Sequence, residues 1–450
     1  MKLSNLFLKS SNFFGLTSDV IYTVLLRGWQ FLAGGLTLIF IIHALSPEEQ
    51  GLYYIFYSIL AIQIFFDLGL TTVLVQFASY EKSKMKWIKN KLSGDSVAKS
   101  RLSSLFRFSI KWYFLAILIM ISSLIPSGLY FISIHDLSLD PIYWKYSWIF
   151  ILLATAFNLA LSPIFSLLEG CDLIKDVARF RLIQDFFSYL VFWGLLYCGF
   201  GLFSAGLFQL LRFLFSISWL FYNKRSIIYD ILNAESKNNL INWRSEIWPM
   251  QWRYGISALS GFFIFQFFPI ALYTFFGPIV AGRMGMSISI TSAIAIIAMS
   301  WLTTKVPKIS FLIHTKKPNE LDHYFYAGLK QALAVSILIG TILAGLVFYF
   351  SLNDFTFIDR IVDPISMMFL ILASILNVII FSFATLLRAF KVERFSLHSF
   401  CTGVIILFTT ILLGKKYGEA GVCLGYFIAI LLVALPWAYL IFVKNRRMVS

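Results

Sequence analysis

The sequence predicts an all-α, polytopic membrane protein of about twelve transmembrane helices in two halves of six. Two observations lead to this fold class. Of the 450 residues, 59% are hydrophobic and 18% aromatic, and only 13% are charged. Apolar windows of about 20 residues, the length that crosses a bilayer as a helix, recur along nearly the whole chain. A soluble core does not hold so much apolar surface, and a membrane β-barrel has no such long apolar runs.

Each predicted span is one of these windows, and its bounds are read from the apolar run. In chain order the spans are 20–43, 51–78, 112–134, 146–168, 182–200, 202–222, 254–276, 279–302, 332–352, 365–386, 397–413 and 422–442.

The segments that connect the spans carry basic residues unevenly. The richest, 79–111, holds Lys82, Lys84, Lys86, Lys89, Lys91, Lys99, Arg101, Arg107 and Lys111. The alternate segments are poor in Lys and Arg and short, so no external catalytic domain is expected. Because Lys and Arg stay on the cytoplasmic side, both termini are predicted to be cytoplasmic. Contact of these basic segments with anionic headgroups accounts for the formal charge of +15 without nucleic acid as a partner.

An internal repeat divides the spans into two halves. Short echoes fall at corresponding spans and in the same order. They are "PEEQG" at 47–51 with "PIVAG" at 278–282, "LLEG" at 167–170 with "LLRA" at 386–389, and "AGL" at 205–207 with "AGV" at 420–422. The prediction is an N-terminal six-helix bundle over 1–222, a cytoplasmic linker over 223–253 and a C-terminal six-helix bundle over 254–450.

Arg27 and Asp67 are charged residues well inside predicted spans. A charge at the centre of a membrane helix costs about 2.5–3.5 kcal/mol, so such residues face a bundle interior or a wet cavity. Counted along the spans, Arg27 and Asp67 lie at similar depth. Two interpretations stay open: a buried salt bridge that compensates two costly charges, and a working role in binding or ion coupling.

Arg212 lies near the middle of its span with no acid at an obvious matching depth, which favours a cavity-lining role. Arg283 lies just after the "PIVAG" turn, near the outer surface, where it can snorkel. Asp185 is predicted to be an interfacial carboxylate beside Arg179 and Arg181.

Two further patterns bear on function. Pro269, with Gln266 one turn earlier, predicts a bend in the seventh span. Metal-spaced His and Glu residues and a phosphate-cradling Gly loop followed by Lys are both missing from the sequence. The chain is therefore not expected to be an enzyme or to need a cofactor.

The stretch "LSPEEQGLYYIFYSILAIQIFFDLGLTTVLVQFAS" resembles the first two spans of bacterial polysaccharide-biosynthesis flippases. These are the O-antigen and capsule-unit translocases of the multidrug/oligosaccharidyl-lipid/polysaccharide exporter superfamily. The Pro-x-x-x-Gly turn, the aromatic span and the "DLGL" element carry the likeness. "FSLLEG" and "KKYGEAGVCLGYFIAILLVALPWAYL" are similar to the corresponding places in that family.

The resemblance implies two six-helix bundles around a central cavity that opens alternately to the two sides of the cell inner membrane. Its implied substrate is an undecaprenyl-pyrophosphate-linked oligosaccharide unit for O-antigen, lipopolysaccharide or capsule synthesis. Arg27, Arg212 and Arg283 are the expected pyrophosphate-binding residues, because Arg suits bidentate phosphate contacts. Asp67 would position Arg27 or take part in ion coupling. Membrane lipids, a polysaccharide polymerase and a chain-length regulator are the implied partners.

Three alternatives remain open on sequence. A multidrug or metabolite antiporter of the same superfamily would share the fold, although a cavity for cationic drugs favours acidic residues. A membrane polysaccharide polymerase would need a sizeable outer segment with catalytic groups. A scaffold without transport gives no reason for Arg212 to lie inside a span.

Overall fold

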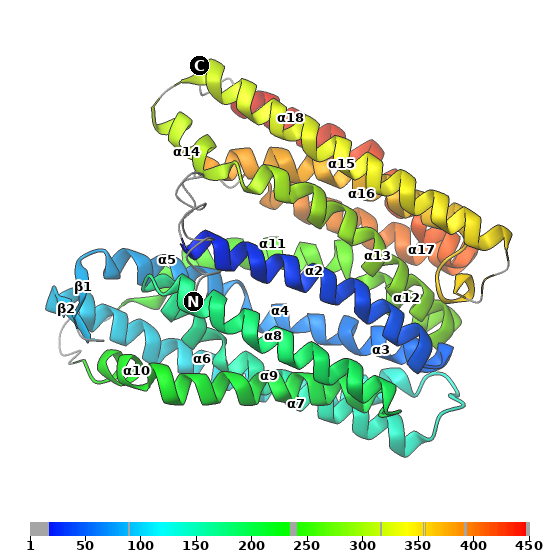
Figure 1. The fold of residues 1–450 in the computed structure, drawn as a ribbon, viewed down its shortest axis with the longest axis horizontal. Coiled ribbons are helices and arrows are strands. Elements are labelled where there is room, and N and C mark those ends of the chain that lie inside the picture. Colours follow the sequence, from blue (N-terminus) through cyan, green and yellow to red (C-terminus); the bar gives the residue numbers. More distant parts are fainter. Residues whose placement is uncertain are drawn as a thin grey trace, which may run out of the picture. The chain divides into compact units, whose positions relative to one another are not determined.

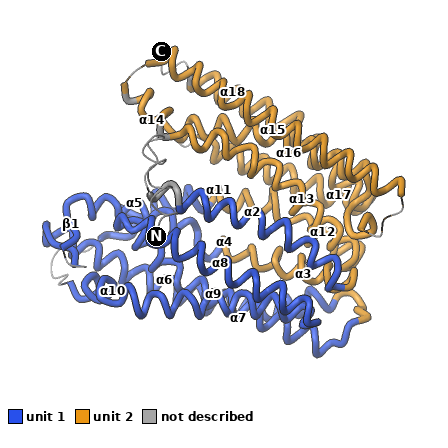
Figure 2. The backbone as a smooth tube through the Cα atoms, viewed as in Figure 1, with its two compact units in different colours: residues 1–45, 65–133, 139–255 blue, residues 46–64, 134–138, 256–450 orange. Residues whose placement is uncertain are grey.

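The computed structural model describes residues 18–88, 91–234, 241–315, 317–353, 355, 357–390 and 394–446. These residues form two compact units (Figure 2), one of 18–45, 65–133 and 139–255, the other of 46–64, 134–138 and 256–446. The division differs from chain order, since 46–64 belongs to unit 2 and 223–255 to unit 1. The six-plus-six division along the chain stays a prediction.

Helices dominate both units (Figure 1). The first part of the chain forms α2 (Ser18–Ala44), α3 (Pro47–Leu60), the 3₁₀ helix η1 (Ala61–Gln63), α4 (Ile64–Asp67), α5 (Leu70–Lys82), β1 (Met85–Ile88), β2 (Lys91–Gly94), α6 (Ser96–Ile132), α7 (Pro141–Gly170), α8 (Ile174–Tyr197), α9 (Phe203–Trp219), the π-helix η2 (Leu220–Lys224) and α10 (Arg225–Leu232).

The second part forms the π-helix η3 (Trp243–Ile247), α11 (Trp248–Phe265), α12 (Phe267–Phe276), α13 (Pro278–Thr303), α14 (Val306–His314), α15 (Pro318–Leu352), the 3₁₀ helix η4 (Ile358–Arg360), α16 (Pro364–Ala389), α17 (Ser396–Ala429), the π-helix η5 (Ile430–Ala434) and α18 (Leu435–Arg446).

The protein is a polytopic all-α membrane protein, as the composition predicts. Within the described residues eight helices are long and apolar enough to cross a membrane, or up to ten if each of two bent helix pairs is one span. Helix α8 is about 36 Å long, enough for a further crossing.

The segment that starts with α17 supplies two crossings, because it folds back at Gly418, where φ is 62°. If the helix were straight, Thr409 and Gly425 would lie about 24 Å apart. In the structure they are neighbours, because a Cβ added to Gly425 would lie 3.2 Å from Cβ of Thr409.

Several helices begin where the sequence combines a capping side chain with proline. In α3 the Ser46 hydroxyl accepts a hydrogen bond from the Glu49 amide, and the Glu49 carboxylate accepts one from the Ser46 amide, with Pro47 as the first helical residue. Asp140 caps α7 and Asp363 caps α16, each again followed by Pro. These side chains satisfy amides that the first helical turn leaves unpaired. The "SPEEQG" stretch is therefore a helix start.

Two spans are bent. The second span is broken between Asp67 and Leu70, and the helix that ends at Phe265 meets α12 at 44°. The second bend confirms the prediction made from Pro269, whose missing N–H leaves the Phe265 carbonyl without its helical partner. The break itself lies at Gln266, where φ is −119°.

The basic segment 79–111, predicted only as a connection between spans, contains parts of two helices and a β-hairpin. Helix α5 runs on to Lys82, and an antiparallel hairpin follows in which Met85 pairs with Gly94 and Ile88 with Lys91. Helix α6 then starts at Ser96 and continues as one helix into the third span. A hydropathy pattern misses such a hairpin because four-residue strands are shorter than the pattern needed to detect them.

The two Pro-x-x-x-Gly elements predicted as equivalent contact each other within unit 2, where α3 packs against α13. A Cβ on Gly51 would lie 2.1 Å from the Pro278 carbonyl oxygen, and a Cβ on Gly282 would lie 2.8 Å from Cα of Gly51. Only glycine permits this backbone contact.

Candidate functional site

The Arg212 cluster, defined here as Gln30, Gln184, Asp185, Arg212 and Ser216, lies inside unit 1 on α2, α8 and α9. An Nη of Arg212 lies 3.1 Å from Oδ1 of Asp185, and Gln30 donates to Oδ2 of Asp185 at 2.8 Å. Gln184 donates to the Arg212 carbonyl and, at 2.7 Å, to the Ser216 hydroxyl. The guanidinium carbon of Arg212 lies 5.6 Å from the ring centroid of Phe208. Three helices thus fix one guanidinium in place.

The partners of Asp185 are Arg212 and Gln30, and not Arg179 and Arg181, beside which the sequence predicted it to lie. Helix α8 begins at Ile174, eight residues before the predicted start of the fifth span, so Asp185 lies about 16 Å along the helix. Its side chain is 2% exposed, whereas that of Arg212 is 32% exposed. The carboxylate is therefore buried behind the guanidinium, and the guanidinium is the charged group that a ligand can reach.

Arg27 lies three residues before Gln30 on α2, on the same side of that helix. Its side chain is exposed, and within the described residues it makes no hydrogen bond or ion pair. The structure therefore does not bring Arg27 and Asp67 together as a salt bridge, one of the two interpretations left open by the sequence. Because one carboxylate, Asp185, accompanies the two guanidiniums of Arg27 and Arg212, this region of unit 1 keeps a formal excess of one positive charge.

Asp67 instead stabilises the break in the second span. Its carboxylate accepts hydrogen bonds from the Thr71 hydroxyl at 3.1 Å, the Thr71 amide at 3.4 Å and the Tyr113 hydroxyl. Leu68 and Gly69 follow with φ of 47° and 72°. At Gly69 a Cβ would also lie 2.6 Å from Cβ of Tyr254, so glycine is required there. The carboxylate thus satisfies the polar groups that a broken helix leaves open inside a membrane.

Arg283 lies in unit 2, near the hairpin turn of α17. Its Nε donates to the Asp359 carbonyl at 3.0 Å, and an Nη lies 3.9 Å from an Oε of Glu419. Next to it, Gln50 donates to the Arg360 carbonyl at 3.0 Å, and burial lowers the pKa of Arg360. Arg283 therefore ties α13 to the loop before α16 and to the turn of α17.

Sequence reasoning missed the uncharged partners Gln30, Gln184 and Tyr113. Two buried polar atoms near the Arg212 cluster, Nε1 of Trp29 and Oγ of Ser188, have no hydrogen-bond partner within the described residues. The Trp29 ring lies 4.8 Å from that of Phe186. Gln30 and Gln184 could have been found from the sequence. A glutamine inside an apolar span indicates a buried polar network, because its side-chain amide needs hydrogen-bond partners inside a membrane.

Unit 2 contains a separate cavity of about 400 Å³ between the end of α11 and helices α12, α13, α16 and α17. Its lining is mainly apolar and aromatic, and no carboxylate occurs among the described residues that form it. They are Phe265, Phe268, Ile288, Thr291, Ser292, Ala295, Ile296, Met299, Leu370, Ser374, Asn377, Phe381 and Tyr426. Asn377 donates to the Tyr426 hydroxyl at 2.9 Å. The cavity has the size and apolar character of a small-molecule site.

No protein-family model and no curated protein matches the sequence, but solved structures share its fold. The MATE multidrug transporter DinF-BH is 14% identical, with 95% of each chain covered and a TM-score of 0.63. The lipid II flippase MurJ in an inward closed conformation is 14% identical, with 96% of this chain and 90% of that chain covered and a TM-score of 0.60. A MOP superfamily transporter from Pyrococcus furiosus, described with a binding pocket of reverse polarity, is 12% identical, with 96% of each chain covered and a TM-score of 0.55. The chain has the fold of MOP superfamily transporters.

Proposed function

We propose that this protein is a flippase of the inner membrane that moves undecaprenyl-pyrophosphate-linked oligosaccharide units from the cytoplasmic to the outer leaflet by alternating access. The observation that carries the proposal is Arg212, whose side chain is one third exposed and whose guanidinium is held inside unit 1 by a buried carboxylate. A pyrophosphate needs fixed cations, and a guanidinium with free donors is suited to it.

Arg27 adds a second cation on the neighbouring helix α2. The fold shared with a lipid II flippase supports a lipid-linked cargo for this chain as well. Arg283 is the weakest of the proposed binding residues, because its partners in unit 2 already occupy it. In this proposal Asp67 has a structural role at the helix break rather than a coupling role.

The test is complementation of a strain that lacks this protein. The wild-type gene restores surface polysaccharide, whereas Arg27→Gln and the double variant Arg212→Gln/Asp185→Asn leave lipid-linked single units on the inner leaflet at unchanged protein level. Arg179→Gln, an exposed arginine on α8 outside the Arg212 cluster, serves as the matched control and restores the polymer. Normal polymer from both site variants would contradict the proposal. Single units that reach the outer surface unpolymerised in the deletion strain would indicate a polymerase.

The cavity of unit 2 favours a second candidate, a multidrug or metabolite antiporter. Its aromatic lining, with Phe265, Phe268 and Tyr426, suits a flat apolar compound. The lining does not supply an anion to pair with a cationic drug, so a neutral compound fits it better. An antiporter would change the resistance of cells to such compounds and leave surface polysaccharide unchanged on deletion.

A further inference from the structure

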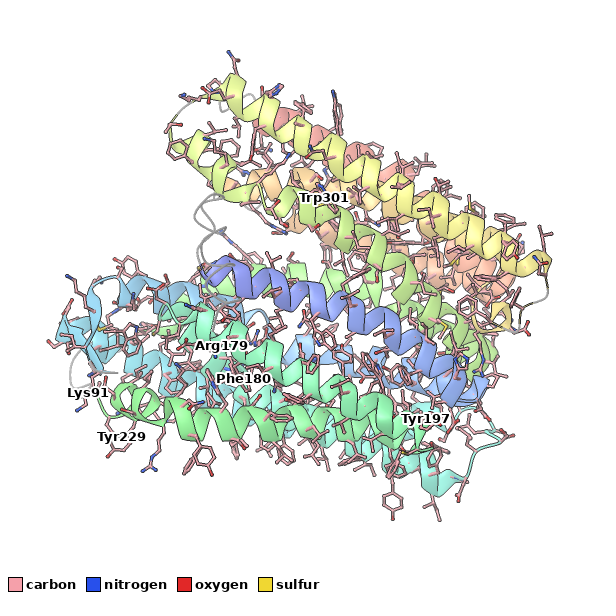
Figure 3. The ribbon with its side chains drawn as sticks, viewed as in Figure 1. Lys91, Arg179, Phe180, Tyr197, Tyr229 and Trp301 are labelled. Carbon is pink, nitrogen blue, oxygen red and sulfur yellow. The ribbon has the colours of Figure 1, made fainter. Side chains whose placement is uncertain are left out.

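We infer that the basic end of unit 1 contains a binding pocket for the headgroup of an anionic phospholipid. The pocket, called here the α10 pocket, has a volume of about 880 Å³ and is formed by β2, the first turns of α6, η2 and α10. Its lining consists of Lys91, Lys99, Phe221, Tyr222, Arg225, Ser226, Tyr229, Asp230, Asn233 and Ala234. Lys91 and Tyr229 lie at the same end of the unit in Figure 3.

The charges of the α10 pocket favour an anion. Asp230 is the acid among the described lining residues, and both of its oxygens are already engaged: Lys99 lies 2.8 Å from one, and the Leu92 amide donates to the other at 3.0 Å. Lys91 and Arg225 are exposed, and neither forms an ion pair within the described residues. Among the residues that the structure describes, no carboxylate neutralises these two cations of the pocket.

The chain holds the α10 pocket at the level of lipid headgroups. Helix α9 is about 25 Å long, close to the thickness of the hydrocarbon core, and it continues directly through η2 into α10. Ile227 and Ile231 on one face of α10 are buried, which anchors the helix to the core of unit 1. Arg107 donates to the Leu232 carbonyl at 3.1 Å and fixes the other end of α10.

Exposed aromatic side chains surround these cations. Phe221, Tyr222 and Tyr229 are 57%, 81% and 68% exposed, which is unusual for a water-facing surface and typical of the membrane interface. The guanidinium carbon of Arg225 lies 5.5 Å from the centroid of the Phe221 ring, which keeps this cation beside the aromatic group. Aromatic rings at the acyl-chain boundary together with cations at the phosphate fit a phospholipid better than a free soluble anion.

Native mass spectrometry of the full chain in detergent, titrated with phosphatidylglycerol or phosphatidylethanolamine, tests the inference. The double variant Lys91→Gln/Arg225→Gln is expected to bind phosphatidylglycerol about 30-fold more weakly, which corresponds to about 2 kcal/mol for two interfacial charges. The control Lys175→Gln/Arg179→Gln removes the same two charges from exposed positions on α8, with Arg179 lying apart from the pocket in Figure 3. It is expected to keep the affinity of the wild type.

Three outcomes would overturn the inference. One is unchanged phosphatidylglycerol binding in the pocket variant, and another is an equal loss in the control. The third is displacement of the lipid by low millimolar inorganic phosphate, which would assign the α10 pocket to a free anion. Both variants should have the same midpoint temperature of thermal unfolding as the wild type. That result verifies that these surface substitutions leave the fold intact.

Discussion

Removal of Arg212 and Asp185, singly and together, separates the structural role of this pair from a role in transport. Arg212→Gln leaves Asp185, which is 2% exposed, as a buried carboxylate that keeps the hydrogen bond from Gln30. Loss of one partner of a buried ion pair costs about 3–5 kcal/mol. Because the Arg212 side chain is 32% exposed, water partly screens this pair. We therefore expect the lower end, about 3 kcal/mol.

Asp185→Asn is expected to cost less, about 1–2 kcal/mol, because the unpaired guanidinium can still reach water and the asparagine can still accept from Gln30. The double variant Arg212→Gln/Asp185→Asn removes both charges and is expected to lie within about 1 kcal/mol of the wild type. Unfolding by sodium dodecyl sulfate titration in mixed micelles measures these free energies. Surface polysaccharide in complemented cells measures transport.

The two measurements should diverge in the double variant. Its stability should recover, while surface polysaccharide should stay absent, because the cation that binds the lipid pyrophosphate is missing. If the double variant recovered both stability and polymer, Arg212 would serve only to neutralise Asp185, and the reasoning would be refuted.

Three further predictions concern the helix break in the second span. Gly69→Ala should destabilise the protein by more than about 2 kcal/mol, because φ is 72° and the new Cβ would lie 2.6 Å from a neighbouring side chain. Gly34→Ala, with no atom within 4 Å of its Cβ, should be neutral or stabilising by up to about 1 kcal/mol, and equal losses would contradict this account. Asp67→Asn and Tyr113→Phe should show a coupling free energy of about 1 kcal/mol in a double-mutant cycle. Asp67→Asn and Arg27→Gln should be additive within about 0.5 kcal/mol, and a larger coupling would restore the salt bridge expected from sequence.

The fold class was predictable because a membrane helix must be about 20 residues long and apolar, and both properties can be read from one sequence. The helix starts were readable as well: Ser46, Asp140 and Asp363 each precede a proline and cap the helix that follows. The bend near Pro269 was predictable as well, because proline has no backbone N–H to donate to the preceding turn of the helix. In each case the information lies within a few neighbouring residues.

The pairing inside the candidate site was not predictable in the same way. Depth counted from predicted span ends placed Asp67 beside Arg27 and left Arg212 without an acid. Helix α8 starts eight residues earlier than the hydropathy indicates, and that shift moves Asp185 to the level of Arg212. Which helices pack together is a long-range property, and a single sequence does not encode it in any local pattern.

The most direct test of the central claim is a flipping assay with the purified chain in proteoliposomes that contain undecaprenyl-pyrophosphate-linked oligosaccharide. Wild-type protein is expected to expose the oligosaccharide to an externally added glycosidase much faster than protein-free vesicles do. The stable double variant Arg212→Gln/Asp185→Asn should not exceed the rate of those vesicles. Equal rates for wild-type protein and protein-free vesicles, or full activity of the double variant, would contradict the claim.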